Sequence, residues 1–163
     1  VALGPLINER QAGKVAEIVG AAVSDGARLA AGGERNGLFF PATVLADVTP
    51  AMRVFKEEIF GPVAPVIRFK TEDEAIVMAN ATEYGLSAAI HTKDVALGLH
   101  LARQLRAGMV HVNGQTVAHA CNAPFGGMGA SGNGGRFGAM TNLDEFSQWQ
   151  WVTAHATPPA YPF

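Results

Sequence analysis

The sequence predicts an α/β fold, with a mostly parallel sheet and helices on both of its faces. From residue 63 onward the chain alternates strand-like and helical patterns in the order strand, helix, strand, helix, strand. Parallel strands joined by crossover helices have this order. The chain has 163 residues, which is also long enough to bury a sizeable core in one domain.

The first part of the chain is predicted to hold a long amphipathic helix followed by two strands. Asn8 and Gln11 resemble a capping box, and apolar residues then recur at helical spacing until Gly26 ends the pattern. Strand-like stretches follow at residues 28–31 and 38–44, and a proline interrupts the second as in an edge strand.

Capping residues and apolar runs predict the remaining regular elements. Thr49 and Pro50 are typical of an N-cap and a first helical residue, and Gly108 is typical of a left-handed residue that ends a helix. The alternating elements are a strand at 63–69, a helix at 72–81, a strand at 86–91, a helix from Asp94 to Arg106 and a strand at 109–113.

The last fifty residues differ from the rest of the chain in composition and in hydrophobic pattern. Residues 114–138 are rich in Gly, Ala, Ser and Asn without periodicity, which predicts a long loop, and such loops are usually functional or covered by another element. Residues 146–152 alternate aromatic and polar side chains, ending on Trp149 and Trp151. This stretch is a candidate strand for pairing with a sheet edge in another subunit.

Composition excludes some function classes. The net charge is −2, which gives no reason to expect nucleic acid or an anionic membrane as a partner. No apolar run has the length of a membrane span, so we expect a soluble protein. Cys121 is the one cysteine and cannot form an internal disulfide, which fits a cytoplasmic location.

Charged residues make up 16% of the chain, few for an isolated surface. The chain also starts at Val1 without a methionine or a targeting pattern. We therefore expect either an oligomer or a piece of a longer protein.

Residues 55–63, FKEEIFGPV, place two carboxylates directly before two large apolar residues and a Gly-Pro pair. On a strand, Glu58 and Phe60 would share one side, and that mixed surface would suit a ligand that is half polar and half flat. The alternative is a helix end with Glu57 and Glu58 solvated, Phe60 in the core and Gly-Pro as a stop signal. Spacing alone favours the helix end, because charged residues are rarely buried.

A glycine motif and a cysteine–histidine pair resemble functional sites, but the residues around them argue against such roles. Gly127, Gly129 and Gly132 form a GxGxxG motif, but a dinucleotide fingerprint needs a strand before it and a helix opening on the last glycine. Cys121 lies two residues from His119, yet no acid or amide is placed to orient the histidine. The five histidines show no ligand spacing, so no metal site is expected.

Four motifs, taken together and in order, resemble the NAD(P)-dependent aldehyde dehydrogenase superfamily. They are FKEEIFGPV at 55–63, NATEYGLSAAIHT at 80–92, RAGMVHVN at 106–113 and APFGGMGASGNGGRFG at 123–138. GPLIN at 4–8 and AAGG at 30–33 extend the resemblance over nearly the whole chain. The loop and the ending are most similar to the benzaldehyde or vanillin dehydrogenase branch.

The resemblance implies roles for residues of this chain. Glu58 matches the residue that holds the nicotinamide ribose hydroxyls of NAD or NADP, and Phe60 matches the aromatic against which the nicotinamide lies. Phe125 matches a wall of the aldehyde funnel. The loop that shapes the aldehyde pocket is matched by residues 113–123, whose candidate specificity residues are Asn113, Gln115, Thr116, Val117 and Cys121.

The resemblance also implies a domain organisation. Residues 1–138 would be a partial catalytic domain whose substrate loop spans residues 113–138. Residues 139–163 would hold an oligomerisation strand at 145–153 and a tail, through which the enzyme forms a homodimer or tetramer.

Other parts of the family machinery have no match in this chain. In the family a cysteine thiolate attacks the aldehyde, the thiohemiacetal passes hydride to NAD(P), and a glutamate activates water. Both residues lie upstream of the GPLIN-like segment, as does the cofactor domain. Cys121 is therefore not the nucleophile, no catalytic residue is assigned, and the chain alone is expected to be inactive. Gly129 stands where a lysine is common, and Arg136 where some members have a glutamate thought to relay protons.

Two rival hypotheses fit the same sequence. One is a self-standing scaffold or interaction module that reuses this half-fold and associates through residues 145–153. The other is a complete small Rossmann protein that uses Gly127 to Gly132. NAD binding or turnover by the isolated chain, and the sequence upstream of Val1, would separate them from an enzyme segment.

Overall fold

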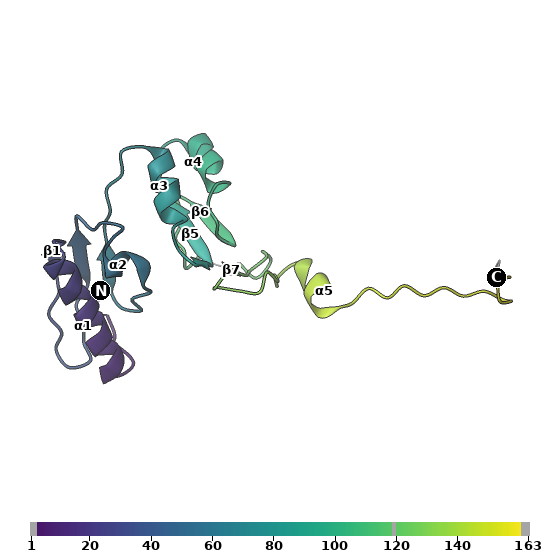
Figure 1. Ribbon diagram of the computed structural model, residues 1–163, viewed down its shortest axis with the longest axis horizontal. Coiled ribbons are helices and arrows are strands. Elements are labelled where there is room, and N and C mark those ends of the chain that lie inside the picture. Colours follow the sequence, from purple (N-terminus) through teal and green to yellow (C-terminus); the bar gives the residue numbers. More distant parts are fainter. Residues whose placement is uncertain (1–2, 119, 161–163) are drawn as a thin grey trace. The chain divides into compact units, whose positions relative to one another are not determined.

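The computed structural model describes residues 3–118 and 120–160, and the chain divides into two compact units, Val1–Thr82 and Glu83–Phe163 (Figure 1). The first unit contains α1 (Glu9–Ser24), β1 (Arg28–Ala31), β2 (Thr43–Ala46), α2 (Arg53–Lys56), β3 (Val63–Pro65) and α3 (Glu72–Ala79). The second contains β4 (Tyr84–Gly85), β5 (Ser87–Ile90), α4 (Val95–Ala102), β6 (Met109–Val112), β7 (Met128–Gly129) and α5 (Thr141–Phe146).

Helix α1 begins and ends where the sequence predicts. The Asn8 side chain accepts a hydrogen bond from the Gln11 backbone N–H at 2.9 Å and caps the first turn. Gly26, with φ +104°, follows the C-cap residue Asp25, because a left-handed residue after a helix costs least with glycine.

The core of the first unit lies between α1 and the sheet. Helix α1 buries one apolar face, and Leu45 of β2 is completely buried against it. The cluster consists of Val15, Ile18, Val19, Ala22, Ala27, Phe40, Leu45, Val48, Met52 and Val54. This packing fixes the position of α1 relative to the segment that follows β2.

The sheet of the first unit is mixed. Strand β1 pairs antiparallel with β2, and β2 pairs parallel with β3. The predicted mostly parallel sheet is therefore wrong for β1 and β2, because strand direction follows from long-range pairing that propensity does not encode. Strand β2 also starts later than predicted, after Pro41, which has no N–H to donate to a ladder.

The second unit contains the crossover that the alternating pattern predicts. Strands β5 and β6 pair in parallel, with Ser87 opposite Met109 and Ile90 opposite Val112, and α4 connects them. Strands β4 and β7 form a short antiparallel pair. The α/β class is thus confirmed, in small sheets that each lie within one unit.

Three local predictions in the capping of helices are wrong. Helix α2 begins at Arg53 with Met52 as N-cap, not at Thr49 and Pro50. Helix α4 ends at Ala102 instead of Arg106. Gly108 lacks a left-handed backbone and is required for space instead, since a Cβ there would overlap the carbonyl oxygen of Gly126.

The C-terminal segment differs from the predicted strand. Residues 145 and 146 belong to α5, and residues 147–153 pair with no strand of the described chain. Trp149 is 100% exposed and Trp151 is 91% exposed. A strand needs the backbone of a second strand to form its hydrogen bonds, and none of the described strands pairs with this segment. No helix in the described part of the chain is long and apolar enough to cross a membrane.

Burial is uneven between the two units. All the apolar side chains that the structure describes as buried belong to the first unit, and all four residues of β6 are half-buried. Parallel strands are normally covered on both faces. Taken by itself, the second unit therefore presents exposed apolar side chains, among them Val95, Leu99 and Phe137.

Candidate functional site

The segment 57–62, here named the Glu58 loop, runs from the end of α2 into β3. Glu57 is the C-cap of α2, and both carboxylates are exposed, as the helix-end interpretation predicts. That interpretation is wrong for Phe60, whose side chain is 75% exposed. Ile59 is the residue that packs against the core, so the loop leaves Phe60 at the surface instead of burying it.

Helix α1 holds the backbone of the Glu58 loop. The side-chain amide of Gln11 donates to the carbonyl oxygens of Ile59 at 2.8 Å and Phe60 at 3.0 Å. Lys14 Nζ donates to the carbonyl oxygen of Glu58 at 3.1 Å. Three successive carbonyls are thus bound by two side chains one helical turn apart, while the side chains of Glu58 and Phe60 remain exposed.

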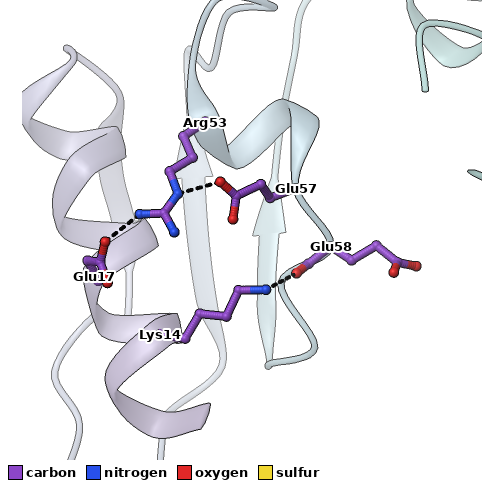
Figure 2. A network of polar contacts seen from close by, with 5 residues as sticks. All are labelled: Lys14, Glu17, Arg53, Glu57 and Glu58. Carbon is purple, nitrogen blue, oxygen red and sulfur yellow. Dashed lines mark hydrogen bonds and ion pairs between the residues drawn. The ribbon is translucent and has the colours of Figure 1, made fainter. Parts of the chain in front are cut away.

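An arginine links α2, α1 and the start of the loop (Figure 2). Arg53 Nε lies 2.6 Å from a carboxylate oxygen of Glu57, and its Nη1 lies 2.5 Å from Glu17. The hydrogen bond from Arg53 lowers the pKa of Glu57, and the positive charges of Arg53 and Lys14 act in the same direction. The two carboxylates raise the pKa of Arg53, so the Arg53–Glu57 pair stays ionised at neutral pH.

The backbone of the loop is strained at one residue. Phe60 has φ +48°, a left-handed conformation that is an outlier for a bulky side chain. Gly61 follows in close contact with α1, because a Cβ there would lie 2.7 Å from Cγ2 of Val15. Strain of this kind persists where the surroundings impose it and clusters at ligand sites.

Glu58 points away from the ion pairs that surround it. In Figure 2 its carboxylate extends outward while its carbonyl faces Lys14. An ionised carboxylate accepts hydrogen bonds and donates none, so this group suits a ligand with hydroxyl donors. The exposed ring of Phe60, two residues on, offers a flat apolar face.

In the second unit, Asn113 closes the parallel pair. Its backbone N–H donates to the carbonyl oxygen of Ile90 at 2.7 Å, and its side-chain oxygen accepts from the Thr92 N–H at 2.8 Å. Its φ of +57° is one that asparagine tolerates. Asn113 therefore fixes the point at which the long loop leaves β6.

The other loop candidates lie at the surface of the second unit. Val117 is 82% exposed, and Cys121 is an exposed free thiol. The carbonyl oxygen of Gln115 accepts from the Ala118 N–H at 2.9 Å, and that of Thr116 accepts from Ser87 Oγ at 3.4 Å. The suggested partner of Cys121, His119, lies outside the described residues.

A hollow of about 420 Å³ lies between β6 and the loop. Phe125, Pro124 and His111 are among its lining residues, and the other five loop candidates are not among the described ones. Nε2 of His111 is buried without a hydrogen-bond partner in the described chain. Sequence reasoning did not single out His111 for this site, because its position on β6 beside the loop is a tertiary feature.

The glycine motif forms no dinucleotide site. Gly127 precedes the two-residue strand β7, and α5 begins only at Thr141, so no helix opens at Gly132. A Cβ on Gly127 would lie 2.4 Å from the carbonyl oxygen of Ser131, and one on Gly132 would lie 2.6 Å from that of Gly127. These glycines permit close backbone packing. Among residues 3–118 and 120–160, no cluster of acidic, histidine or cysteine side chains could hold a metal ion.

Comparison with known proteins decides the family. The profile of the aldehyde dehydrogenase family matches residues 1–152. The chain belongs to the aldehyde dehydrogenase family. It is 51% identical over 163 residues to the NAD(+) benzaldehyde dehydrogenase of Pseudomonas putida and 46% identical over 164 residues to a vanillin dehydrogenase of an Amycolatopsis species.

Solved aldehyde dehydrogenases share the fold. The salicylaldehyde dehydrogenase of Pseudomonas putida G7, complexed with salicylaldehyde, superposes with a TM-score of 0.92 at 37% identity over 99% of this chain. An aldehyde dehydrogenase of Mycobacterium tuberculosis, complexed with NAD+, gives a TM-score of 0.84 at 38% identity over 91% of this chain.

Coverage is unequal between this chain and its aldehyde dehydrogenase relatives. The whole chain matches the Pseudomonas putida and Amycolatopsis enzymes, and the match spans 34% of each of them. The two solved structures are covered to 33% and 31%. The chain therefore spans about one third of the length of these relatives.

Proposed function

We propose that this chain acts as the C-terminal part of an NAD(P)-dependent aldehyde dehydrogenase that oxidises aromatic aldehydes to carboxylic acids. The observation that carries the proposal is the Glu58 loop, an exposed carboxylate and an exposed ring held on a fixed backbone. Family membership and the names of the benzaldehyde, vanillin and salicylaldehyde dehydrogenases that match the chain support it.

The Glu58 loop fits a nicotinamide cofactor. Bound NAD(P) would accept hydride from the substrate. The Glu58 carboxylate would accept hydrogen bonds from the two hydroxyls of the nicotinamide ribose, charge-assisted bonds that are among the stronger ones in proteins. Phe60 would lie against the flat nicotinamide ring, and its left-handed backbone, bound at the carbonyl by Gln11, sets the direction of its side chain.

The second unit supplies the substrate side of the proposal. Phe125 borders the hollow beside β6 and would form a wall for the ring of the aldehyde. Asn113, Gln115, Thr116, Val117 and Cys121 belong to the same loop and would adjust the shape and polarity of the pocket. An aromatic wall favours an aromatic substrate through offset ring contacts.

The apolar surface of the second unit supports a role within a larger assembly. Residues 145–153 would pair with a sheet edge of a second subunit and give the exposed rings of Trp149 and Trp151 a partner. Replacing both tryptophans with serine should shift the intact enzyme to a smaller species in sedimentation. An unchanged sedimentation coefficient would remove residues 145–153 from the interface.

The test of function uses the intact enzyme, meaning the full-length protein that carries this segment. An equivalent is the Pseudomonas putida benzaldehyde dehydrogenase with its matching third replaced by this chain. We expect NAD- or NADP-dependent oxidation of benzaldehyde and vanillin, with kcat/KM above that for aliphatic aldehydes, and no turnover by the 163-residue chain alone. Absence of turnover by the intact enzyme would favour a scaffold or interaction module instead.

The role of Glu58 is tested in the same enzyme. Glu58→Gln removes the charge and should raise the KM for NAD about tenfold, because a hydrogen bond to a charged group contributes about 1.5–3 kcal/mol. Glu34→Gln, at another exposed carboxylate of the first unit, is the matched control and should leave the KM unchanged. Equal kinetics for both variants would refute the assignment of Glu58 to the cofactor.

A further inference from the structure

Arg136 binds the glycine-rich part of the substrate loop from inside. Its Nη1 lies 3.0 Å from the carbonyl oxygen of Gly127, 3.1 Å from that of Gly134 and 2.8 Å from that of Gly135. The contacts with Gly127 and Gly135 are partly buried. All three carbonyl oxygens surround one nitrogen that carries two hydrogens, so at least one hydrogen is shared between two acceptors, and a single side chain joins the two arms of the loop.

Glycines on two other segments leave room for this guanidinium. A Cβ on Gly126 would lie 2.8 Å from Cδ and 3.2 Å from Nη1 of Arg136, and one on Gly108 would lie 3.3 Å from its Nη2. Gly108 precedes β6, and Gly126 follows the predicted funnel residue Phe125. Gly108 and Gly126, which both lie outside the GxGxxG motif, thus leave space for the Arg136 side chain.

The arms joined by Arg136 carry a pair of aromatic residues. The Phe125 N–H donates to the carbonyl oxygen of Phe137 at 2.7 Å, and the Phe137 N–H donates back at 3.0 Å. Their ring centroids are 5.2 Å apart, within the range of favourable ring contacts. Arg136 lies beside Phe137 in sequence and binds Gly127, two residues after Phe125, so its hydrogen bonds adjoin this pair.

We infer that Arg136 is a positioning residue that holds Phe125 at the wall of the aldehyde pocket through the carbonyl oxygen of Gly127. The inference rests on the proposed function for the pocket, but the hydrogen bonds stand without it. It also reassigns a position at which the resemblance suggested a proton-relaying glutamate. A carboxylate cannot donate to these carbonyls, so this chain uses the position for loop geometry and not for proton transfer.

The test compares Arg136→Lys, Arg136→Gln and Arg136→Glu in the intact enzyme. In Arg136→Gln we expect amide hydrogen exchange at Phe125 and Phe137 to accelerate about tenfold and the KM for benzaldehyde to rise about tenfold. The KM for NAD and kcat at saturating aldehyde should change less than twofold. Arg136→Lys, which keeps the positive charge and N–H donors on a shorter side chain, should recover part of the wild-type exchange rate and KM.

Arg136→Glu decides between positioning and proton relay. If Arg136 is a positioning residue, Arg136→Glu should show faster amide exchange and a higher KM for benzaldehyde than Arg136→Gln, because a carboxylate repels the carbonyl oxygens. If the position relays protons, Arg136→Glu should maintain or raise kcat. Arg103→Gln, at an exposed arginine after α4, is the matched control and should change neither exchange nor KM.

Two outcomes would overturn the inference. One is unchanged exchange at Phe125 in Arg136→Gln, and the other is accelerated exchange with an unchanged KM for aromatic aldehydes. Amide exchange is measured without turnover. It therefore tests whether Arg136 holds the loop even in a protein without aldehyde dehydrogenase activity. A wild-type enzyme that oxidises no aldehyde would count against the proposed function, and the exchange result for Arg136 would still hold or fail by itself. Should Arg136→Glu fail to fold, the Lys and Gln variants carry the comparison.

Discussion

The side-chain amide of Gln11 donates to the carbonyl oxygen of Phe60 at 3.0 Å, across 49 positions of sequence. This bond connects the first turn of α1 to Phe60, the residue of the Glu58 loop whose backbone is left-handed. The same amide also binds Ile59. The strained backbone of Phe60 is therefore held in place by a specific hydrogen bond.

Gln11→Leu should loosen the Glu58 loop without removing any side chain of the proposed cofactor site. Two lost hydrogen bonds correspond to about 1–3 kcal/mol. We therefore expect the KM for NAD to rise by roughly five- to hundredfold. The KM for the aldehyde should be nearly unchanged. Steady-state kinetics of the intact enzyme measure both. Arg10→Leu, at an exposed neighbour on α1, is the control, and an equal effect of the two variants would contradict the role of Gln11.

Phe60→Gly should separate stability from function. Glycine relieves the left-handed backbone but costs conformational entropy, and the exposed ring loses little burial, so the free energy of unfolding should change by less than about 1 kcal/mol. The kcat/KM for NAD should nevertheless fall, because the flat face is gone. Phe69→Gly removes another exposed ring and should spare the kinetics; a loss of kcat/KM there as well would argue against a specific role of Phe60.

Gly61→Ala should destabilise the first unit. The new Cβ would lie 2.7 Å from Cγ2 of Val15, and forcing an extra carbon into a packed site typically costs about 1–3 kcal/mol. Thermal unfolding measures the loss, and a second change, Val15→Ala, should recover part of it. Gly20→Ala, on α1 with open space around its Cβ, should instead stabilise by about 0.5–1 kcal/mol.

The Arg53–Glu57 pair should make stability depend on pH at the acid end. The pKa of Glu57 is lowered from its ordinary value of 4.5 by the hydrogen bond from Arg53. A carboxylate whose pKa is depressed in the folded state stabilises it above the unfolded-state pKa, and this contribution is lost as pH falls through the folded-state value. The difference in melting temperature between wild type and Glu57→Gln should therefore shrink below pH 4.5. A difference that stays constant from neutral to strongly acidic pH would contradict this account.

High salt should weaken the same contribution, since both partners are at the surface and exposed ion pairs are screened. Melting curves of wild type and Glu57→Gln at low and high salt at neutral pH provide this check. A difference that grows with salt would point to a cause other than the ion pair.

Elements set by local signals were predictable from sequence. Asn8 and Gly26 gave the bounds of α1 because an N-cap and a left-handed stop act within one turn. Strand β1 and the crossover from β5 through α4 to β6 followed from apolar runs between capping residues. The family was predictable too, because its motifs are contiguous in the chain.

Features that depend on distant partners required the tertiary structure. The antiparallel pairing of β1 with β2, the exposure of Phe60 and the unpaired segment 147–153 each depend on contacts that no local pattern specifies.

The sequence by itself determined the limits of α1, the α/β class, the family and the two candidate residues Glu58 and Phe60. Only the tertiary structure decided how they are held. Gln11 and Lys14 reach the loop's carbonyls from α1, and Arg136 reaches three carbonyls within the glycine-rich loop. Hydrogen bonds from side chains to backbone carbonyls carry no sequence signature on the acceptor side, since every residue has a carbonyl, and so they emerge only when the chain is folded.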